Sequence, residues 1–173
     1  MNLLAKFTPI KLFVFDVDGV LTDGKLLLLD SGEMARSMNV KDGYAMQLAL
    51  KKGYEILIIS GGTSEAVKLR FTKLGIKNVE LGIKDKVTIL NDFIVSNNFR
   101  LDQILYMGDD IPDIPPMKIV GLPCAPADAA QEVLNEAMYI SPKMGGGGCV
   151  RDVVEKVLKL NNHWNDNFTT SST

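Results

Sequence analysis

Two groups of carboxylates in the sequence have the composition of a divalent-cation site. Asp16 and Asp18 follow the apolar run 12–15, and Asp109, Asp110 and Asp113 follow the apolar run that ends at residue 107. Clustered carboxylates repel one another unless a cation or a proton relieves the repulsion, and oxygen ligands beside a phosphate suit Mg2+. An Asp-Gly turn after the first run and a helix cap at Asp110 are the structural alternatives. The pattern favours carboxylate chemistry around Mg2+.

Two further segments could hold a phosphate group. Ser60 and Gly61 follow the apolar run 54–59 and precede a predicted helix, where a hydroxyl and unpaired backbone N–H groups can bind phosphate oxygens. Lys86 lies near the start of the next predicted helix. An N-cap made by Thr63 or Ser64 would explain the first segment equally well, and a solvated surface position would explain Lys86. Neither segment is specific when taken alone.

The composition excludes several other classes of protein. His163 is the sole histidine, so neither a Ser-His catalytic triad nor a histidine-rich zinc site is expected. Cys124 and Cys149 have no CxxC spacing, which suits a reducing compartment. A net charge of -2 gives no basic field for nucleic acid or an anionic membrane. Because the apolar runs are short and the opening residues lack the pattern of a signal peptide, we expect a cytoplasmic protein without a membrane span.

The spacing of apolar residues predicts alternating strands and helices. Strands are expected at 12–15, 54–59 and 103–107, weaker strands at 78–81, 118–122 and 138–140, and helices at 43–52, 64–74, 84–97 and 150–160. This alternation predicts an α/β fold with a doubly wound, Rossmann-like parallel sheet and helices on both faces. Ligands bind such a sheet at the carboxyl ends of its strands, so Asp16, Ser60 and Asp109 are expected to converge.

The length of 173 residues fits a single domain. We expect this domain to cover residues 1–160, with a small β-hairpin inserted at about 24–40, soon after the first strand. Residues 161–173 are predicted to be a polar, frayed tail in which Trp164 and Phe168 could pack on the domain.

The combination of motifs is far more specific than its parts. The order DxDGxxTDG from Asp16, a Ser-Gly pair at Ser60, a lysine at Lys86 and GDDxxD from Gly108 resembles the haloacid dehalogenase superfamily of phosphotransferases. The chain length, the small hairpin in place of a large cap, and the glycine-rich segment 145–151 are similar to the capless 3-deoxy-D-manno-octulosonate 8-phosphate phosphatases. The resemblance covers about residues 11–160. It implies a Mg2+-dependent sugar-acid phosphatase of lipopolysaccharide precursor synthesis.

The resemblance also implies a role for each residue of the motifs. Asp16 would be the nucleophile that forms an aspartyl-phosphate, and Asp18 would be the general acid and base. Mg2+ would be held by Asp16, the backbone carbonyl of Asp18, and Asp109. The remaining groups would be Asp110 and Asp113 as supports of the metal and the lysine, and Ser60, Gly61 and Lys86 as ligands of the phosphoryl oxygens.

For the sugar, the resemblance implies contacts from the turn after the hairpin and from additional cations. The candidates are Asn39, Lys41, Asp42, Gly43, Arg70 and Arg151, with Lys143 as a further cation. Each lone cation also fits an ordinary surface charge. Gln47 and Gly62 stand where many members carry basic residues, and Lys143 stands at a usual arginine. The absence of an acidic side chain at Gly62 favours the eight-carbon acid over the alternative, a nine-carbon sialic-type acid 9-phosphate.

Two classes of non-enzymatic protein fit the sequence less well. A phospho-receiver domain shares the fold class, a phosphorylated aspartate and a lysine, but it would lack both DxDG and GDDxxD. A catalytically inactive binding module is disfavoured because every acid of the set is present.

The expected partners are a small-molecule sugar-acid phosphate and further copies of the chain. The run Leu26–Leu29 is more apolar than a solvent-facing ribbon needs, and capless members of the superfamily close their sites with a neighbouring subunit. We therefore expect a homotetramer in which the hairpins pack together and the segment 144–151 reaches the next subunit's site.

Overall fold

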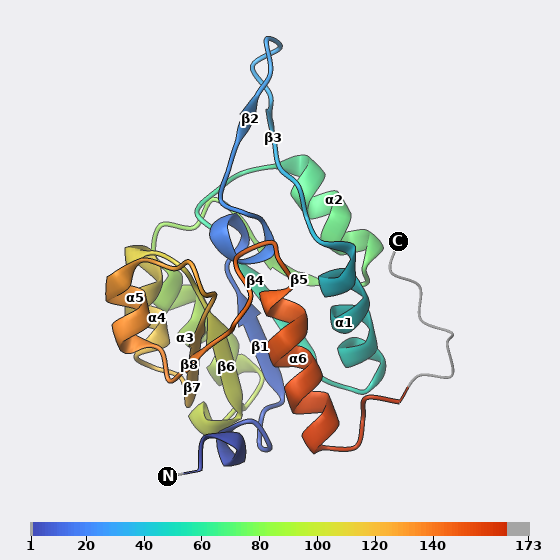
Figure 1. Cartoon of the computed structure of the whole chain (residues 1–173), viewed down its shortest axis with the longest axis vertical. Helices are drawn as coiled ribbons and strands as arrows, with labels where there is room; N and C mark the ends of the chain where they lie inside the picture. The colour runs from blue at the N-terminus through green and yellow to red at the C-terminus, as the bar shows by residue number, and fades with distance from the viewer. Residues whose placement is uncertain (1, 166–173) are drawn as a thin grey trace.

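A central parallel sheet organises the chain, which the computed structural model describes over residues 2–165 (Figure 1). The sheet has six strands in the order β5-β4-β1-β6-β7-β8, and each neighbouring pair is parallel. The strands are β1 (Leu12–Phe15), β4 (Glu55–Ile59), β5 (Asn78–Glu80), β6 (Ile104–Met107), β7 (Leu122–Ala125) and β8 (Tyr139–Ile140). This confirms the predicted doubly wound α/β fold.

Alternate residues of β1 bury their side chains on opposite faces of the sheet. Phe13 and Phe15 join one hydrophobic cluster, and Leu12 and Val14 join the other. Such burial on both faces explains why the sequence of β1 is a continuous apolar run. As Figure 1 shows, one face is covered by α1 (Val40–Lys51) and α6 (Cys149–Leu160), beside α2 (Glu65–Lys73), and the other face by α3 (Lys86–Ser96), α4 (Ile114–Met117) and α5 (Gln131–Glu136).

Part of the chain after β6 differs from the sequence-based prediction. The strand predicted at 118–122 is wrong, because β7 lies at Leu122–Ala125 and residues 118–121 form a turn. Pro123 lies inside β7, and a proline, which lacks an N–H group, argues against a strand in a sequence pattern. The short helices α4 and α5 follow no clear apolar period and were not predicted.

The predicted hairpin is present and projects beyond the sheet (Figure 1). It forms a separate antiparallel pair, β2 (Leu27–Leu28) with β3 (Met34–Ala35). Its apolar side chains face outward in this chain, with Leu27 65% and Leu28 72% exposed.

The first residues of the predicted polar tail pack on the domain. His163 Nδ1 lies 2.9 Å from the hydroxyl of Tyr54, and the Trp164 ring lies edge-on to Tyr44 with the guanidinium of Arg151 above it. Phe168 lies outside the described residues. Among residues 2–165, no helix is both long enough and apolar enough to cross a membrane.

Candidate active site

The carboxyl ends of β1, β4 and β6 border a cavity of about 540 Å³. The chain order reverses between β1 and β6, which is where ligands bind in open α/β sheets. The cavity is lined by all eight residues that the motifs single out: Asp16, Asp18, Ser60, Gly61, Lys86, Asp109, Asp110 and Asp113. Residues separated by almost a hundred positions therefore share one site.

A tight turn after β1 brings the first two acids to the cavity. Residues Val17–Leu21 form a tight turn that is closed by a 3.0 Å hydrogen bond from the Thr22 N–H to the Val17 carbonyl. Asp16 precedes this turn, and its carboxylate accepts a 2.7 Å hydrogen bond from the Val17 N–H. Gly19 has φ +87°, and a Cβ at this position would lie 1.9 Å from Asp109 Oδ2. The DxDG motif thus needs its glycine for two reasons, a left-handed backbone and the close approach of the β6 carboxylate.

Lys86 lies between two carboxylates at the floor of the cavity. Its Nζ is 2.7 Å from Asp113 Oδ1 and 3.2 Å from Asp16 Oδ1, and its side chain is only 6% exposed. The Tyr106 hydroxyl, from β6, also donates to Asp113 Oδ1 at 2.7 Å. Asp113 in turn accepts from the backbone N–H of Asp109 at 3.1 Å. The solvated surface position considered for Lys86 is therefore wrong.

Burial and crowding raise the proton affinity of two of the acids. Burial, followed by the charge of Asp113, raises the pKa of Asp16 to about 6. Burial, followed by the charges of Asp113, Asp16 and Asp110, raises the pKa of Asp109 to about 7. For Lys86, burial favours the neutral form, but the two carboxylates outweigh it and raise the pKa. The site thus concentrates negative charge that a cation would relieve.

The donors present fit a magnesium ion. Carboxylate oxygens of Asp16, Asp109 and Asp113 lie within 4.8 Å of one another. Asp109 Oδ1 is buried and has no hydrogen-bond partner, whereas both oxygens of Asp113 accept hydrogen bonds. An all-oxygen set with an unsatisfied buried carboxylate oxygen matches the ligand preference of Mg2+. Asp109 and Asp16 are thus better placed as ligands than Asp113, which is occupied by Lys86 and Tyr106.

The chain after strand β4 carries hydroxyl and amide groups that line the cavity on the side away from β6. Ser60 follows β4 and is 3% exposed, and its Oγ accepts a 3.2 Å hydrogen bond from the Gly62 N–H. Gly61 lines the cavity between them.

At the β6 side, Asp110 caps the short helical turn Ile111–Asp113, with Oδ1 2.8 Å from the Ile111 N–H. The cap considered from the sequence is thus present at a residue that also borders the cavity.

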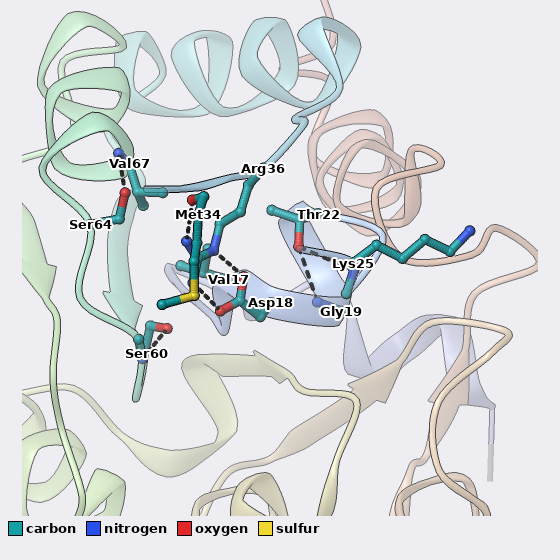
Figure 2. Close-up of polar contacts among 12 residues, drawn as sticks. Val17, Asp18, Gly19, Thr22, Lys25, Met34, Arg36, Ser60, Ser64 and Val67 are labelled. Atoms are coloured by element: carbon teal, nitrogen blue, oxygen red, sulfur yellow. Dashed lines mark hydrogen bonds and ion pairs between the residues drawn. The ribbon is translucent and has the colours of Figure 1, made fainter. Parts of the chain in front are cut away.

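Arg36, which no sequence motif indicated, contacts Asp18 directly. It follows β3 of the hairpin, and its Nε and Nη2 lie 2.6 and 3.1 Å from the two carboxylate oxygens of Asp18 (Figure 2). A lone arginine in a hairpin looks like an ordinary surface charge. The feature of the sequence that could have indicated Arg36 is the position of the hairpin. An insert that starts soon after DxDG brings the end of its second strand back near the DxDG residues.

The residues expected to contact the sugar do not line this cavity. Arg70 lies with Arg36 on a neighbouring cavity of about 360 Å³ between the segment 34–38 and α2. Gly43 leaves room for the Arg70 side chain to pack against α1, because a Cβ at Gly43 would lie 2.8 Å from Arg70 Nη2. Lys41 is an exposed residue in the first turn of α1.

The remaining candidates lie where α1 meets α6. Asn39 caps α1 through the Lys41 N–H and donates to the Gly146 carbonyl at 3.3 Å. Asp42 is 1% exposed and accepts a 2.7 Å hydrogen bond from the Arg151 N–H, and burial raises its pKa to about 6. The Arg151 side chain pairs with Glu155 at 3.0 Å and shares with Lys143 a separate cavity of about 240 Å³.

The glycine-rich segment packs against the DxDG turn of its own chain. Gly146 N–H donates to the Val20 carbonyl at 2.9 Å, and a Cβ on Gly145 would lie 1.9 Å from the Gly19 carbonyl oxygen. The segment therefore holds the turn that carries Asp16 and Asp18 in place.

Without metal, the protein is expected to be more stable at about pH 5 than at about pH 8. The raised pKa values of Asp16, Asp42 and Asp109 exceed those of unfolded aspartates, which are about 4. The native state then binds more protons than the unfolded state, so stability falls as pH rises from about 4 to about 7. Thermal melts in EDTA should show this, and Mg2+ added at about pH 8 should raise Tm. A metal-free Tm that increases from about pH 5 to about pH 8 would contradict the raised pKa values of these three aspartates.

Comparisons with known proteins give a consistent result. The chain is 36% identical to the 3-deoxy-D-manno-octulosonate 8-phosphate phosphatase KdsC of Escherichia coli K12, over 91% of this chain and 84% of that protein. It is 32% identical to the Yersinia pestis protein of the same name, with the same coverage. No family profile matches the sequence.

Solved structures agree in fold as well as in sequence. The crystal structure of the Yersinia pestis phosphatase has a TM-score of 0.91 at 32% identity, covering 93% of this chain and 87% of that one. The Moraxella catarrhalis 3-deoxy-D-manno-octulosonate 8-phosphate phosphatase, in complex with a magnesium ion, a phosphate ion and a KDO molecule, has a TM-score of 0.90 at 33% identity, covering 94% of each chain. A Legionella pneumophila hydrolase of the HAD superfamily, subfamily III A, also has a TM-score of 0.90, at 34% identity over 92% of this chain and 88% of that one. The chain belongs to the 3-deoxy-D-manno-octulosonate 8-phosphate phosphatase family of the haloacid dehalogenase superfamily.

Proposed function

We propose that this protein is a Mg2+-dependent phosphatase that removes phosphate from 3-deoxy-D-manno-octulosonate 8-phosphate in lipopolysaccharide precursor synthesis. The observation that carries the proposal is the convergence of Asp16, Lys86 and Asp109 on one cavity at the carboxyl ends of β1 and β6. The family membership supports the same reaction, as does the relative that binds magnesium, phosphate and KDO.

Asp16 is the nucleophile of the reaction. Its carboxylate attacks phosphorus in line, so that a bond from Asp16 oxygen to phosphorus forms as the bond from phosphorus to the sugar oxygen breaks. Asp18 gives its proton to the departing alcohol. Asp18 then takes a proton from a water molecule that attacks phosphorus, and the bond to Asp16 breaks to release inorganic phosphate.

The other residues of the cavity bind and orient the phosphoryl group. Lys86, the Ser60 hydroxyl and the Gly61 N–H stabilise the charge on its oxygens, and Asp113 holds Lys86 in place through the 2.7 Å ion pair. A magnesium ion would be held by Asp16, Asp109 and the backbone carbonyl of Asp18, with Asp110 as a supporting residue. When bound, it would neutralise charge between the nucleophile and the phosphate.

Cations near the cavity distinguish a sugar acid from a neutral sugar. Arg70 lies on the cavity next to Arg36, where a guanidinium can bind a carboxylate by two parallel hydrogen bonds. The further candidates for sugar contacts rank below Arg70 because they lie at the start of α1 or the start of α6. They are Asn39, Lys41, Asp42, Gly43 and Arg151.

Arg70→Ala is expected to lower kcat/KM for the eight-carbon acid phosphate by about ten- to one-hundred-fold, the loss of one charged hydrogen bond worth about 1.5–3 kcal/mol. The same change should leave hydrolysis of a neutral hexose phosphate unaltered, because that substrate has no carboxylate. Arg100→Ala removes an exposed arginine paired with Asp102 and serves as the control. An equal loss on both substrates would contradict a carboxylate contact.

The assembly and location of the protein complete the proposal. Residues 1–160 form one hydrolase domain, followed by the segment 161–173, in a cytoplasmic protein. The exposed leucines of β2 support a homotetramer in which hairpins pack together and neighbouring subunits complete the sites. A sample that is monomeric by small-angle scattering and is fully active at the same concentration would contradict the tetramer.

The reaction is tested by phosphate release from 3-deoxy-D-manno-octulosonate 8-phosphate with the purified chain. Turnover is expected with Mg2+ and not with EDTA, and it should return when Mg2+ is restored. Equal turnover in EDTA would contradict the proposal.

A further inference from the structure

A charged side chain that follows the hairpin contacts Asp18 from a neighbouring cavity, and nothing in the motifs accounts for it. Arg36 approaches Asp18 with two nitrogens, Nε at 2.6 Å from Oδ1 and Nη2 at 3.1 Å from Oδ2. Its Nη1 donates to the carbonyl of Met34 at 3.2 Å, within the hairpin itself (Figure 2). All three nitrogens of the guanidinium are thus used, two on Asp18 and one on the hairpin backbone.

This contact has the geometry of a positioning interaction. The Arg36 side chain is 10% exposed and that of Asp18 is 36% exposed, so the more accessible of the two is held by the more buried. A planar fork that engages both carboxylate oxygens fixes the direction in which the carboxylate faces, which a single point charge does not.

Gly62 closes the other side of the same pair. A Cβ at Gly62 would lie 3.1 Å from Asp18 Oδ2 and 3.4 Å from Arg36 Nη2. The first of these distances is tighter than ordinary contact, so the pair occupies the space that the missing side chain leaves. The loop after β4 and the hairpin therefore enclose the Asp18 carboxylate from two directions.

We infer that Arg36 is a positioning residue for the reaction, which directs the ionised Asp18 carboxylate toward the attacking water and so links the conformation of the hairpin to the step in which Asp18 acts as the base. This inference rests on the proposed function of Asp18. It also assigns the hairpin a role beyond association of subunits: a shift of β3 relative to the DxDG turn moves the carboxylate that takes the proton from the attacking water. Misplacement of a catalytic group by about 1 Å can cost about one-hundred-fold in rate.

The test is a double-mutant cycle between Arg36→Gln and Asp18→Asn in the full chain with Mg2+. Arg36→Gln should lower kcat for the eight-carbon acid phosphate by about ten- to one-hundred-fold, with KM changed by less than about threefold. In the Asp18→Asn background, Arg36→Gln should change kcat by less than about threefold, because the group that it directs no longer transfers protons. Arg36→Lys keeps the charge without the fork, and should recover only part of the loss.

Arg100→Gln is the matched control. Arg100 holds Asp102 by the same two-nitrogen contact, at 3.0 and 2.8 Å, but on the surface, with 68% of its side chain exposed. It should leave kcat and Tm unchanged, and melts of each Arg36 variant identify any loss of folding.

The proposed function is supported if the wild type turns over the sugar acid phosphate and Asp16→Asn does not. Given that outcome, three results would overturn the inference about Arg36. These are an unchanged kcat in Arg36→Gln, a raised KM at constant kcat, which would make Arg36 a substrate contact, and full additivity with Asp18→Asn. If wild-type protein releases no phosphate from the sugar acid, the proposed function itself fails.

Discussion

Asp16→Asn is expected to reduce phosphatase activity by at least about a thousand-fold. The amide keeps the size of the side chain but is a far weaker nucleophile, so the aspartyl-phosphate cannot form at a useful rate. The change also removes a carboxylate that lies 3.2 Å from Lys86 and within the acidic group with Asp109. Phosphate release at saturating substrate measures the loss.

The stability of the same variant separates chemistry from folding. Removing a carboxylate whose pKa burial raises to about 6 relieves repulsion, so metal-free Asp16→Asn should be at least as stable as the wild type at about pH 8. Asp92→Asn makes the same chemical change on the exposed surface of α3 and should leave activity intact. Residual activity of about a tenth or more in Asp16→Asn would rule out this aspartate as the nucleophile.

Lys86→Met is expected to impair both activity and stability. Loss of one preorganised donor to the phosphoryl oxygens costs about one-hundred- to one-thousand-fold in kcat. Removal of the cation also leaves Asp16 and Asp113 buried without their partner, and breaking a buried ion pair in this way costs about 3–5 kcal/mol. Denaturant unfolding in EDTA measures the second effect.

Lys77→Met is a suitable control, because Lys77 is an exposed residue between α2 and β5. It should alter neither quantity. A variant Lys86→Met with wild-type kcat would show that the ion pairs at the floor of the cavity are structural only.

The convergence of the acidic and phosphate-binding motifs was predictable because strand ends in a parallel sheet meet at one edge. Each of the runs before Asp16, Ser60 and Asp109 is apolar on both faces, which marks a central strand. Their order in the chain then fixes their positions at the switch point between β1 and β6.

Contacts that depend on tertiary packing were not predictable in the same way. Tyr106 belongs to the apolar run of β6, and only the folded chain places its hydroxyl on Asp113. Arg36 reaches Asp18 because it follows β3, where the chain returns from the hairpin toward the DxDG turn, and the sequence spacing of 18 residues carries no helical or strand period for that contact. Asp42 reads as a sugar contact in the motif, yet its carboxylate accepts the Arg151 N–H at the start of α6.

The most direct test of the account is the ratio of kcat/KM for 3-deoxy-D-manno-octulosonate 8-phosphate to that for glucose 6-phosphate, with Mg2+ present. Both substrates carry the phosphate that Lys86 and Ser60 bind, so a preference must come from the carboxylate and the longer chain. We predict that the eight-carbon acid exceeds glucose 6-phosphate by at least about one-hundred-fold, and exceeds a nine-carbon sialic-type acid 9-phosphate as well. Equal values for the sugar acid and glucose 6-phosphate would contradict the assignment.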